Sequence, residues 1–100
     1  MKMSEENINI IQKYFLDKPV VKAFVFGSFA RGDADSNSDY DILVDLDYSK
    51  KIGLEFMQMQ IDLVDLLKTN VDLVSTRALS KYIRPFVDND KILIYERKNR

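Results

Sequence analysis

The sequence contains no cysteine and no histidine. Without cysteine the chain can form no disulfide, no thiolate metal site and no cysteine nucleophile. Without histidine it lacks the commonest general base and the ligand of most transition-metal sites. The 16 aspartates and glutamates are the abundant remaining metal ligands, and carboxylate oxygens suit Mg²⁺ or Mn²⁺. Any metal chemistry in this chain is therefore expected to rest on carboxylates.

The sequence also lacks a long apolar run and an excess of charge of either sign. No apolar stretch approaches the roughly 20 residues of a membrane helix, and the first residues lack the apolar core of a signal peptide. We therefore expect no membrane association and a cytoplasmic location. A net charge of −1 gives no basic surface for a polyanion, which argues against nucleic acid as a partner. One hundred residues, 46% of them hydrophobic, fit one domain spanning residues 1–100.

Hydrophobic periodicity predicts alternating helices and strands. Helices are predicted from Ser4 to just before Pro19, over 54–68, and over 79–87 with a break at Pro85; strands are predicted over 20–26, 41–47, 71–74 and 92–95. In the second helix the predicted buried stripe is Met57, Ile61, Val64 and Leu67, widened by Leu63 and Leu66. Residues 88–90 are predicted to form a turn, and residues 96–100 a solvated tail. This order predicts an α/β fold with a mixed sheet of about four strands and helices packed on one face.

The stretch between the first two strands carries the chemistry. Asp39 and Asp41 are two residues apart, so on one strand they project from the same face. Two neighbouring carboxylates repel, and a divalent cation is the usual partner that keeps both ionised. Gly27 permits a sharp turn and close backbone approach, and Ser28 is a natural N-cap for a helical turn whose N–H groups favour an anion such as phosphate. The stretch therefore predicts a metal beside a phosphate site.

These residues also allow other interpretations. Asp39 and Asp41 could be ordinary polar residues of a loop and a strand start, and Gly27 and Ser28 a capped turn. Residues 33–41 also carry acids or asparagine at alternate positions, as in a calcium-binding EF-hand loop. That loop requires glycine at its sixth position and glutamate at its twelfth, where this chain has Ser38 and Val44. The loop is not a Walker A motif either, because no Gly-Lys-Ser/Thr ends it.

The pattern Gly27-Ser28, ten intervening residues, then Asp39-Tyr40-Asp41 resembles the signature of the nucleotidyltransferase superfamily typified by DNA polymerase beta. The form GSFARG…SDYDILV is most similar to its small stand-alone members, the minimal nucleotidyltransferase (MNT) domains, which include the MntA-type antitoxins. The resemblance covers most of the chain and implies the small nucleotidyltransferase fold. It also implies transfer of AMP from ATP to a hydroxyl, with release of pyrophosphate.

The resemblance further implies the site residues. Asp39 and Asp41 would hold Mg²⁺, with two ions expected, and Gly27 and Ser28 would hold the triphosphate of ATP. In the superfamily a third carboxylate on a neighbouring strand helps to hold the second metal and can activate the attacking hydroxyl. Asp72 is the only acid in a strand-like run downstream of Asp41, so we assign it this role.

The resemblance also bears on partners. Small members of the family often act beside a helical HEPN protein as antitoxin to its toxin, and some adenylylate a tyrosine of that protein. Two alternatives stay open: a catalytically silent module that neutralises a partner by binding it, and a small-molecule transferase of the aminoglycoside type with a deep pocket. Also open are the oligomeric state, homo- or hetero-oligomeric, and the roles of Arg31, Lys81 and Arg84. For Arg31 an ion pair with an acid such as Asp33 is favoured.

Overall fold

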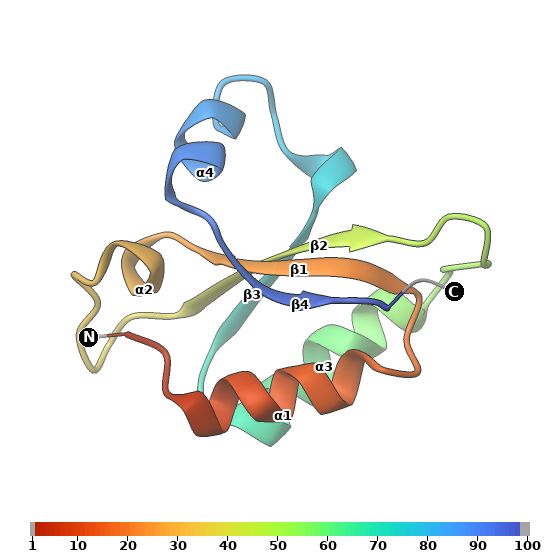
Figure 1. The fold of residues 1–100 in the computed structure, drawn as a ribbon, viewed down its shortest axis with the longest axis horizontal. Coiled ribbons are helices and arrows are strands. Elements are labelled where there is room, and N and C mark those ends of the chain that lie inside the picture. The colour runs from red at the N-terminus through yellow and green to blue at the C-terminus, as the bar shows by residue number, and fades with distance from the viewer. Residues whose placement is uncertain (1, 99–100) are drawn as a thin grey trace.

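Strands rich in β-branched and aromatic residues form a four-stranded mixed sheet. The structure is a computed structural model that describes residues 2–98 (Figure 1). Its elements are α1 (Glu5–Phe15), β1 (Val20–Phe26), α2 (Ser28–Arg31), β2 (Tyr40–Leu46), α3 (Glu55–Leu67), β3 (Val71–Ser75), the 3₁₀ helix η1 (Thr76–Ala78), α4 (Arg84–Asp90) and β4 (Ile92–Glu96). The α/β class and the mixed sheet predicted from the sequence are confirmed.

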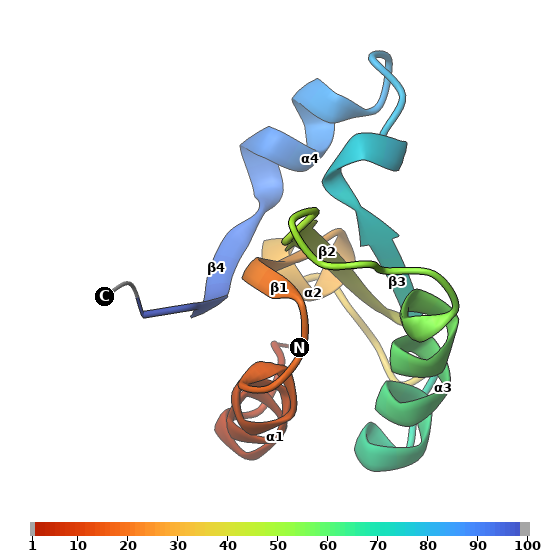
Figure 2. The ribbon, with the colours of Figure 1, turned by 90° about the vertical axis from the view of Figure 1, so that its right-hand side faces the viewer.

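The strand order is β3-β2-β1-β4. β1 lies antiparallel to both β2 and β4, whereas β2 and β3 are parallel and are connected through α3. Helices α1 and α3 lie side by side beneath one face of the sheet, and α4 lies on the opposite side (Figures 1 and 2). The sheet therefore has one face closed by two long helices and one face covered only in part.

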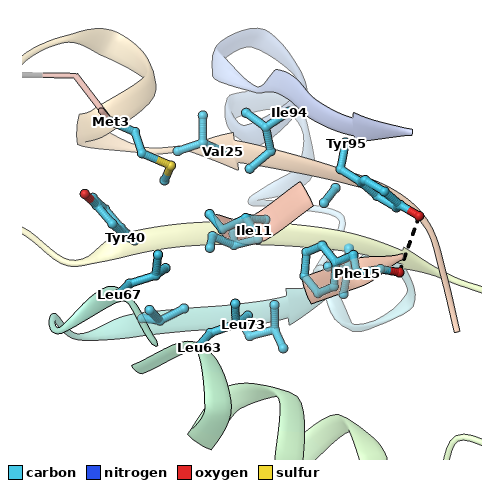
Figure 3. Close-up of a cluster of buried hydrophobic side chains, with 14 of the residues drawn as sticks. Met3, Ile11, Phe15, Val25, Tyr40, Leu63, Leu67, Leu73, Ile94 and Tyr95 are labelled. Carbon is cyan, nitrogen blue, oxygen red and sulfur yellow. Dashed lines mark hydrogen bonds between the residues drawn. The ribbon is translucent and has the colours of Figure 1, made fainter. Parts of the chain in front are cut away.

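The hydrophobic core lies between the sheet and the helices α1 and α3. In Figure 3, Ile11 and Phe15 of α1 and Leu63 and Leu67 of α3 belong to one buried cluster over the same face of the strands. The Tyr95 hydroxyl donates a hydrogen bond to the Phe15 carbonyl at 3.3 Å, so this buried ring also has its polar atom satisfied. Helix α1 starts as the sequence predicts, because the Ser4 hydroxyl accepts a hydrogen bond from the Asn7 N–H.

Helix α3 forms where it is predicted, but the predicted buried stripe is only partly right: Leu63 and Leu67 are buried as predicted, whereas Met57, Ile61 and Leu66 are not. The fully buried positions are Met59, Leu63 and Leu67, which recur every four residues and so share one face. Met57, Ile61 and Leu66 are 61%, 59% and 43% exposed. Eight of the 13 residues of this helix are apolar and form a wide stripe, so periodicity alone could not tell which part of that stripe faces the sheet.

The predicted break at Pro85 is also wrong. Pro85 lies in the first turn of α4, where its missing N–H would have had no partner within the helix. The helix therefore begins at Arg84 and continues to Asp90, through residues 88–90 that were predicted to form a turn.

Both edges of the sheet are capped by glutamine side chains from the helices. On the β3 edge, the Gln60 amide of α3 accepts from the Leu73 N–H at 2.9 Å and donates to the Val71 carbonyl. On the β4 edge, the Gln12 amide of α1 donates to the Ile94 carbonyl at 2.9 Å. Backbone groups that an edge strand would otherwise expose are satisfied within the chain.

Residues 96–100 were predicted to form a solvated tail, but Arg97 in this segment makes an ion pair with another part of the chain. The Arg97 guanidinium pairs with Asp47 at 2.7 Å. The pKa of Asp47 is lowered to about 2, chiefly by a hydrogen bond from Ser49 and next by the one from Arg97. Residues 99–100 of the predicted tail lie outside the described residues. No helix in residues 2–98 is long and apolar enough to cross a membrane.

The two leucines of α3 give a matched test of which stripe is buried. Leu63→Ala removes a fully buried side chain and should lower the free energy of unfolding by about 2–5 kcal/mol. Leu66→Ala removes a side chain that is 43% exposed and should cost less than about 1 kcal/mol. Chemical denaturation followed by circular dichroism measures both, and equal losses would contradict the assigned helix face.

Candidate active site

Asp41 of β2 and Asp72 of β3 are direct partners in the parallel register of these strands. The next residues along each strand, Ile42 and Leu73, belong to the core on the α1/α3 side. Because side chains alternate along a strand, Asp41 and Asp72 project from the other face of the sheet, which we call the open face. The structure thus brings together two acids that are 31 residues apart in the sequence.

Asp39 adds a third negative charge next to this pair. It is an exposed residue just before β2. The pKa of Asp41 is raised to about 6, first by burial, then by the charge of Asp72 and then by that of Asp39, with Arg31 acting in the opposite direction. Asp41 is therefore the centre of a cluster whose negative charge is not balanced.

This cluster fits a hard cation in its chemistry. All three groups are carboxylates, and the raised pKa of Asp41 marks a place where added positive charge would be stabilising. Within residues 2–98, however, no three acidic side chains are already close enough to one another to hold a metal ion. The roles of Asp39, Asp41 and Asp72 as ligands remain a prediction.

Gly27 lies against the carboxylate of Asp41. Its φ of +73° is one that residues with a side chain rarely adopt, and a Cβ built there would be 2.3 Å from Asp41 Oδ2. The Gly27 carbonyl accepts from the N–H groups of Ala30 and Arg31, both at 3.0 Å. Glycine at this position therefore allows the turn after β1 to touch the acidic cluster.

Ser28 is the first residue of α2, and Gly27 is its N-cap, so the predicted N-cap is displaced by one residue. The Ser28 side chain is half-buried in the same turn. Gly27 and Ser28 thus lie next to the acids, as the predicted phosphate site requires. Their binding of a triphosphate remains a prediction.

Arg31, at the end of α2, forms two ion pairs. Its Nε lies 3.2 Å from Asp33 and its Nη1 lies 3.0 Å from Asp90 of α4. The pair with Asp33 was predicted, whereas the pair with Asp90 was missed. Nothing in the local sequence links residues 59 positions apart, and Asp90 was assigned to a turn. Through this pair α2 holds one end of α4.

The acids lie on an open surface. Two hollows in the described part of the chain, one between α1 and β4 and one around Pro19 and Arg97, are not lined by these acids. Lys81 and Arg84 are exposed as well. The Arg84 guanidinium donates to the Thr76 carbonyl at 2.8 Å, and the Lys81 amine lies 5.4 Å from the Tyr82 ring.

Comparison of the sequence with models of known protein families shows which family the chain belongs to. Residues 6–100 match the family model described as "Polymerase beta, Nucleotidyltransferase". The chain belongs to this nucleotidyltransferase family. The resemblance predicted from the Gly-Ser and Asp-x-Asp pattern is confirmed, and with it the assignment as an enzyme of the nucleotidyltransferase class.

Relatives agree with this assignment. MJ0128 of Methanocaldococcus jannaschii, named as a candidate protein adenylyltransferase, is 35% identical over 99 residues, covering 94% of this chain and all of the relative. The protein adenylyltransferase MntA of Thermococcus cleftensis is 37% identical over 70 residues, or 70% of each chain. A solved structure named as a candidate minimal nucleotidyltransferase superposes with a TM-score of 0.75 at 31% identity, covering 87% of this chain and 88% of its own.

Structures of a toxin–antitoxin pair share the fold. One, a toxin–antitoxin complex with AMP-PNP, gives a TM-score of 0.73 at 23% identity, covering 95% of this chain and 76% of the other. Another is titled as a tri-AMPylated Shewanella oneidensis HEPN toxin in complex with its MNT antitoxin, with a TM-score of 0.70 at 22% identity, covering 94% of this chain and 73% of the other. At these identities the likeness is one of fold.

The contact between Gly27 and Asp41 can be tested with a matched glycine. Gly27→Ala should lower the free energy of unfolding by about 2–4 kcal/mol, because it adds a clash to an unfavourable φ. Gly53 also has a positive φ, +49°, but a Cβ there would meet nothing within 4 Å. Gly53→Ala should therefore cost only about 1 kcal/mol. If thermal denaturation gives the two variants equal losses, the close approach to Asp41 is not the constraint.

The raised pKa of Asp41 gives a stability prediction with a definite sign. The unfolded chain loses this proton near pH 4 and the folded chain near pH 6, so ionisation increasingly destabilises the fold as the pH rises through this window. With divalent cations removed by EDTA, Asp41→Asn should therefore be more stable than the wild type at pH 7.5. After allowance for solvent screening of this half-exposed group, the difference should be about 1 kcal/mol.

The same comparison near pH 3 should show little advantage for Asp41→Asn, because Asp41 is then mostly protonated in both the folded and the unfolded state. Asp65→Asn, which alters an exposed carboxylate of α3, serves as the control and should stay within about 0.5 kcal/mol of the wild type at both pH values. Urea denaturation at the two pH values measures all three proteins. A less stable Asp41→Asn at pH 7.5 would contradict the repulsion inferred for the cluster.

Proposed function

We propose that this protein transfers AMP from ATP to a hydroxyl of a protein partner, as the antitoxin of a HEPN/MNT pair. The observation that carries the proposal is the pairing of Asp41 with Asp72 across β2 and β3, beside the turn at Gly27 and Ser28. This arrangement places acids from two strands next to a backbone turn suited to phosphate.

Each residue has a role in the proposed reaction. Gly27 and Ser28 bind the triphosphate through the turn after β1. Asp72 accepts the proton of the attacking hydroxyl, whose oxygen forms a bond to the α-phosphorus. The bond from that phosphorus to the bridging oxygen breaks, and pyrophosphate leaves. Asp39 and Asp41 would hold Mg²⁺ together with Asp72, and bound Mg²⁺ supplies positive charge that offsets the charge of the phosphates.

The openness of the site supports a protein acceptor. Asp39 and Asp72 are exposed, and the acids line neither the hollow between α1 and β4 nor the one around Pro19 and Arg97. A small-molecule transferase would be expected to enclose its substrate in a pocket. The names of the relatives point the same way, since several carry protein adenylyltransferase in their names and one structural neighbour contains an AMPylated HEPN toxin. The partner proposed here is likewise a HEPN-type helical protein.

The proposal can be tested with labelled ATP, Mg²⁺ and the protein product of the adjacent reading frame, as the candidate acceptor. We expect the wild type to release pyrophosphate and to add AMP to a hydroxyl of that protein, seen by mass analysis. Asp41→Asn and Asp72→Asn should each lower the rate at least a hundredfold, because each removes a charge from the site. EDTA should abolish the reaction.

Asp45→Asn is the matched control. Asp45 lies on the same strand and face as Asp41 but near the other end of β2, where its carboxylate accepts from the Thr76 hydroxyl. Transfer by this variant should stay within a few fold of the wild type. Neutralisation of the partner without any transfer would instead support the catalytically silent binding module. Transfer to an aminoglycoside without a protein partner would support the small-molecule alternative.

A further inference from the structure

Helix α4 packs on the open face of the sheet, the face that carries the acids. Leu43 and Val87 are 1% and 3% exposed, yet neither belongs to the core cluster beneath the sheet. Leu43 lies two residues after Asp41 on β2, so its side chain projects from the same face. The burial of Val87 of α4 outside the core agrees with the place of this helix in Figures 1 and 2, opposite α1 and α3. Helix α4 therefore lies on the same face of the sheet as Asp41.

Three contacts fix how α4 crosses this face. At its start, the Arg84 guanidinium donates to the Thr76 carbonyl in η1, just after β3. At its end, Asp90 pairs with Arg31 of α2, and the Lys91 amine lies 4.8 Å from the centre of the Phe24 ring on β1. The helix thus runs from the end of β3 towards the turn at Gly27 and Ser28.

The geometry of the helix then places Phe86. Residues four apart lie on the same side of a helix, so Phe86 lies on the flank of Asp90, which faces α2. It is one turn further from α2 than Asp90. Arg84 points to the opposite flank, towards η1. The Phe86 ring is 71% exposed, so packing within the described chain does not explain an aromatic residue here.

We propose that Phe86 is the platform on which the base of the nucleoside triphosphate stacks. The inference rests on the proposed function, which places the triphosphate at Gly27 and Ser28 beside α2. The base must then lie a ribose away from that turn, and Phe86 presents an aromatic face one helical turn from the contact between α2 and α4. Stacking on an aromatic ring accepts any base, since every base has a π-face. The acceptor protein is the other conceivable occupant of this ring, and the experiment separates the two.

The sequence has no tryptophan, so Phe86→Trp introduces a single reporter at this position. We expect its fluorescence to be quenched on addition of ATP with Mg²⁺, but not on addition of inorganic tripolyphosphate, which has the same phosphates and no base. Tyr48→Trp is the control. Tyr48 follows the far end of β2, with the Arg77 guanidinium 3.6 Å from its ring centre, and its fluorescence should respond to neither ligand.

Phe86→Ala should weaken ATP binding about tenfold, which corresponds to about 1.4 kcal/mol, and should leave tripolyphosphate binding unchanged. Phe86→Tyr should restore ATP binding, and Tyr48→Ala should not alter it. Isothermal titration calorimetry measures these affinities. The proposal is overturned if Phe86→Ala binds ATP as tightly as the wild type does, even if the variant transfers AMP to the acceptor more slowly. It is also overturned if the variant loses affinity for ATP and for tripolyphosphate equally.

Measurements on the wild type distinguish a failure of this inference from a failure of the proposed function. If the wild type binds neither ATP nor tripolyphosphate, both are wrong. If it binds ATP and transfers AMP while Phe86→Ala behaves identically, the proposed function stands and the stacking role alone is rejected.

Discussion

The parallel pairing of β2 with β3 is the constraint on which the site depends. It sets Asp41 directly beside Asp72, at the strand separation of a sheet, which is roughly 4.8 Å. The carboxylates of these paired residues repel, and this repulsion contributes to the raised pKa of Asp41, although burial raises it most. The pairing survives this repulsion because the next residue of each strand, Ile42 and Leu73, is packed into the core on the other face. Hydrophobic packing on one side of the sheet thus holds an unfavourable charge arrangement on the other.

The two faces of the sheet therefore have different tasks. The face covered by α1 and α3 holds most of the buried apolar side chains and fixes the register of the strands (Figure 3). The open face carries Asp41 and Asp72, and the turn at Gly27 touches it. Helix α4 covers part of this face, and Arg31 of α2 pairs with Asp90 of α4. Residues outside the acidic cluster can therefore influence the site by placing α4.

The sequence was most informative where short-range rules apply. The order of elements and the Ser4 cap follow from local patterns, and the Gly-Ser and Asp-x-Asp spacing led to the correct family. The pairing of Asp41 with Asp72 was reached through the family resemblance, because no local pattern encodes which strands are neighbours. Prediction failed where tertiary contacts decide. Periodicity could not say which stripe of α3 faces the sheet, and nothing near Arg31 indicates its bond to Asp90.

The glutamine caps on the sheet have a consequence for molecular recognition. An exposed edge strand is a template for a further strand, through which peptides and misfolded copies commonly attach. The Gln60 and Gln12 side chains form hydrogen bonds with backbone groups on the β3 and β4 edges. A strand from another molecule would first have to displace one of these amides. Assembly by extending the sheet is disfavoured at those positions. Association with another molecule is favoured instead on surfaces formed by side chains, such as the open face, where side-chain chemistry rather than generic backbone pairing selects what binds.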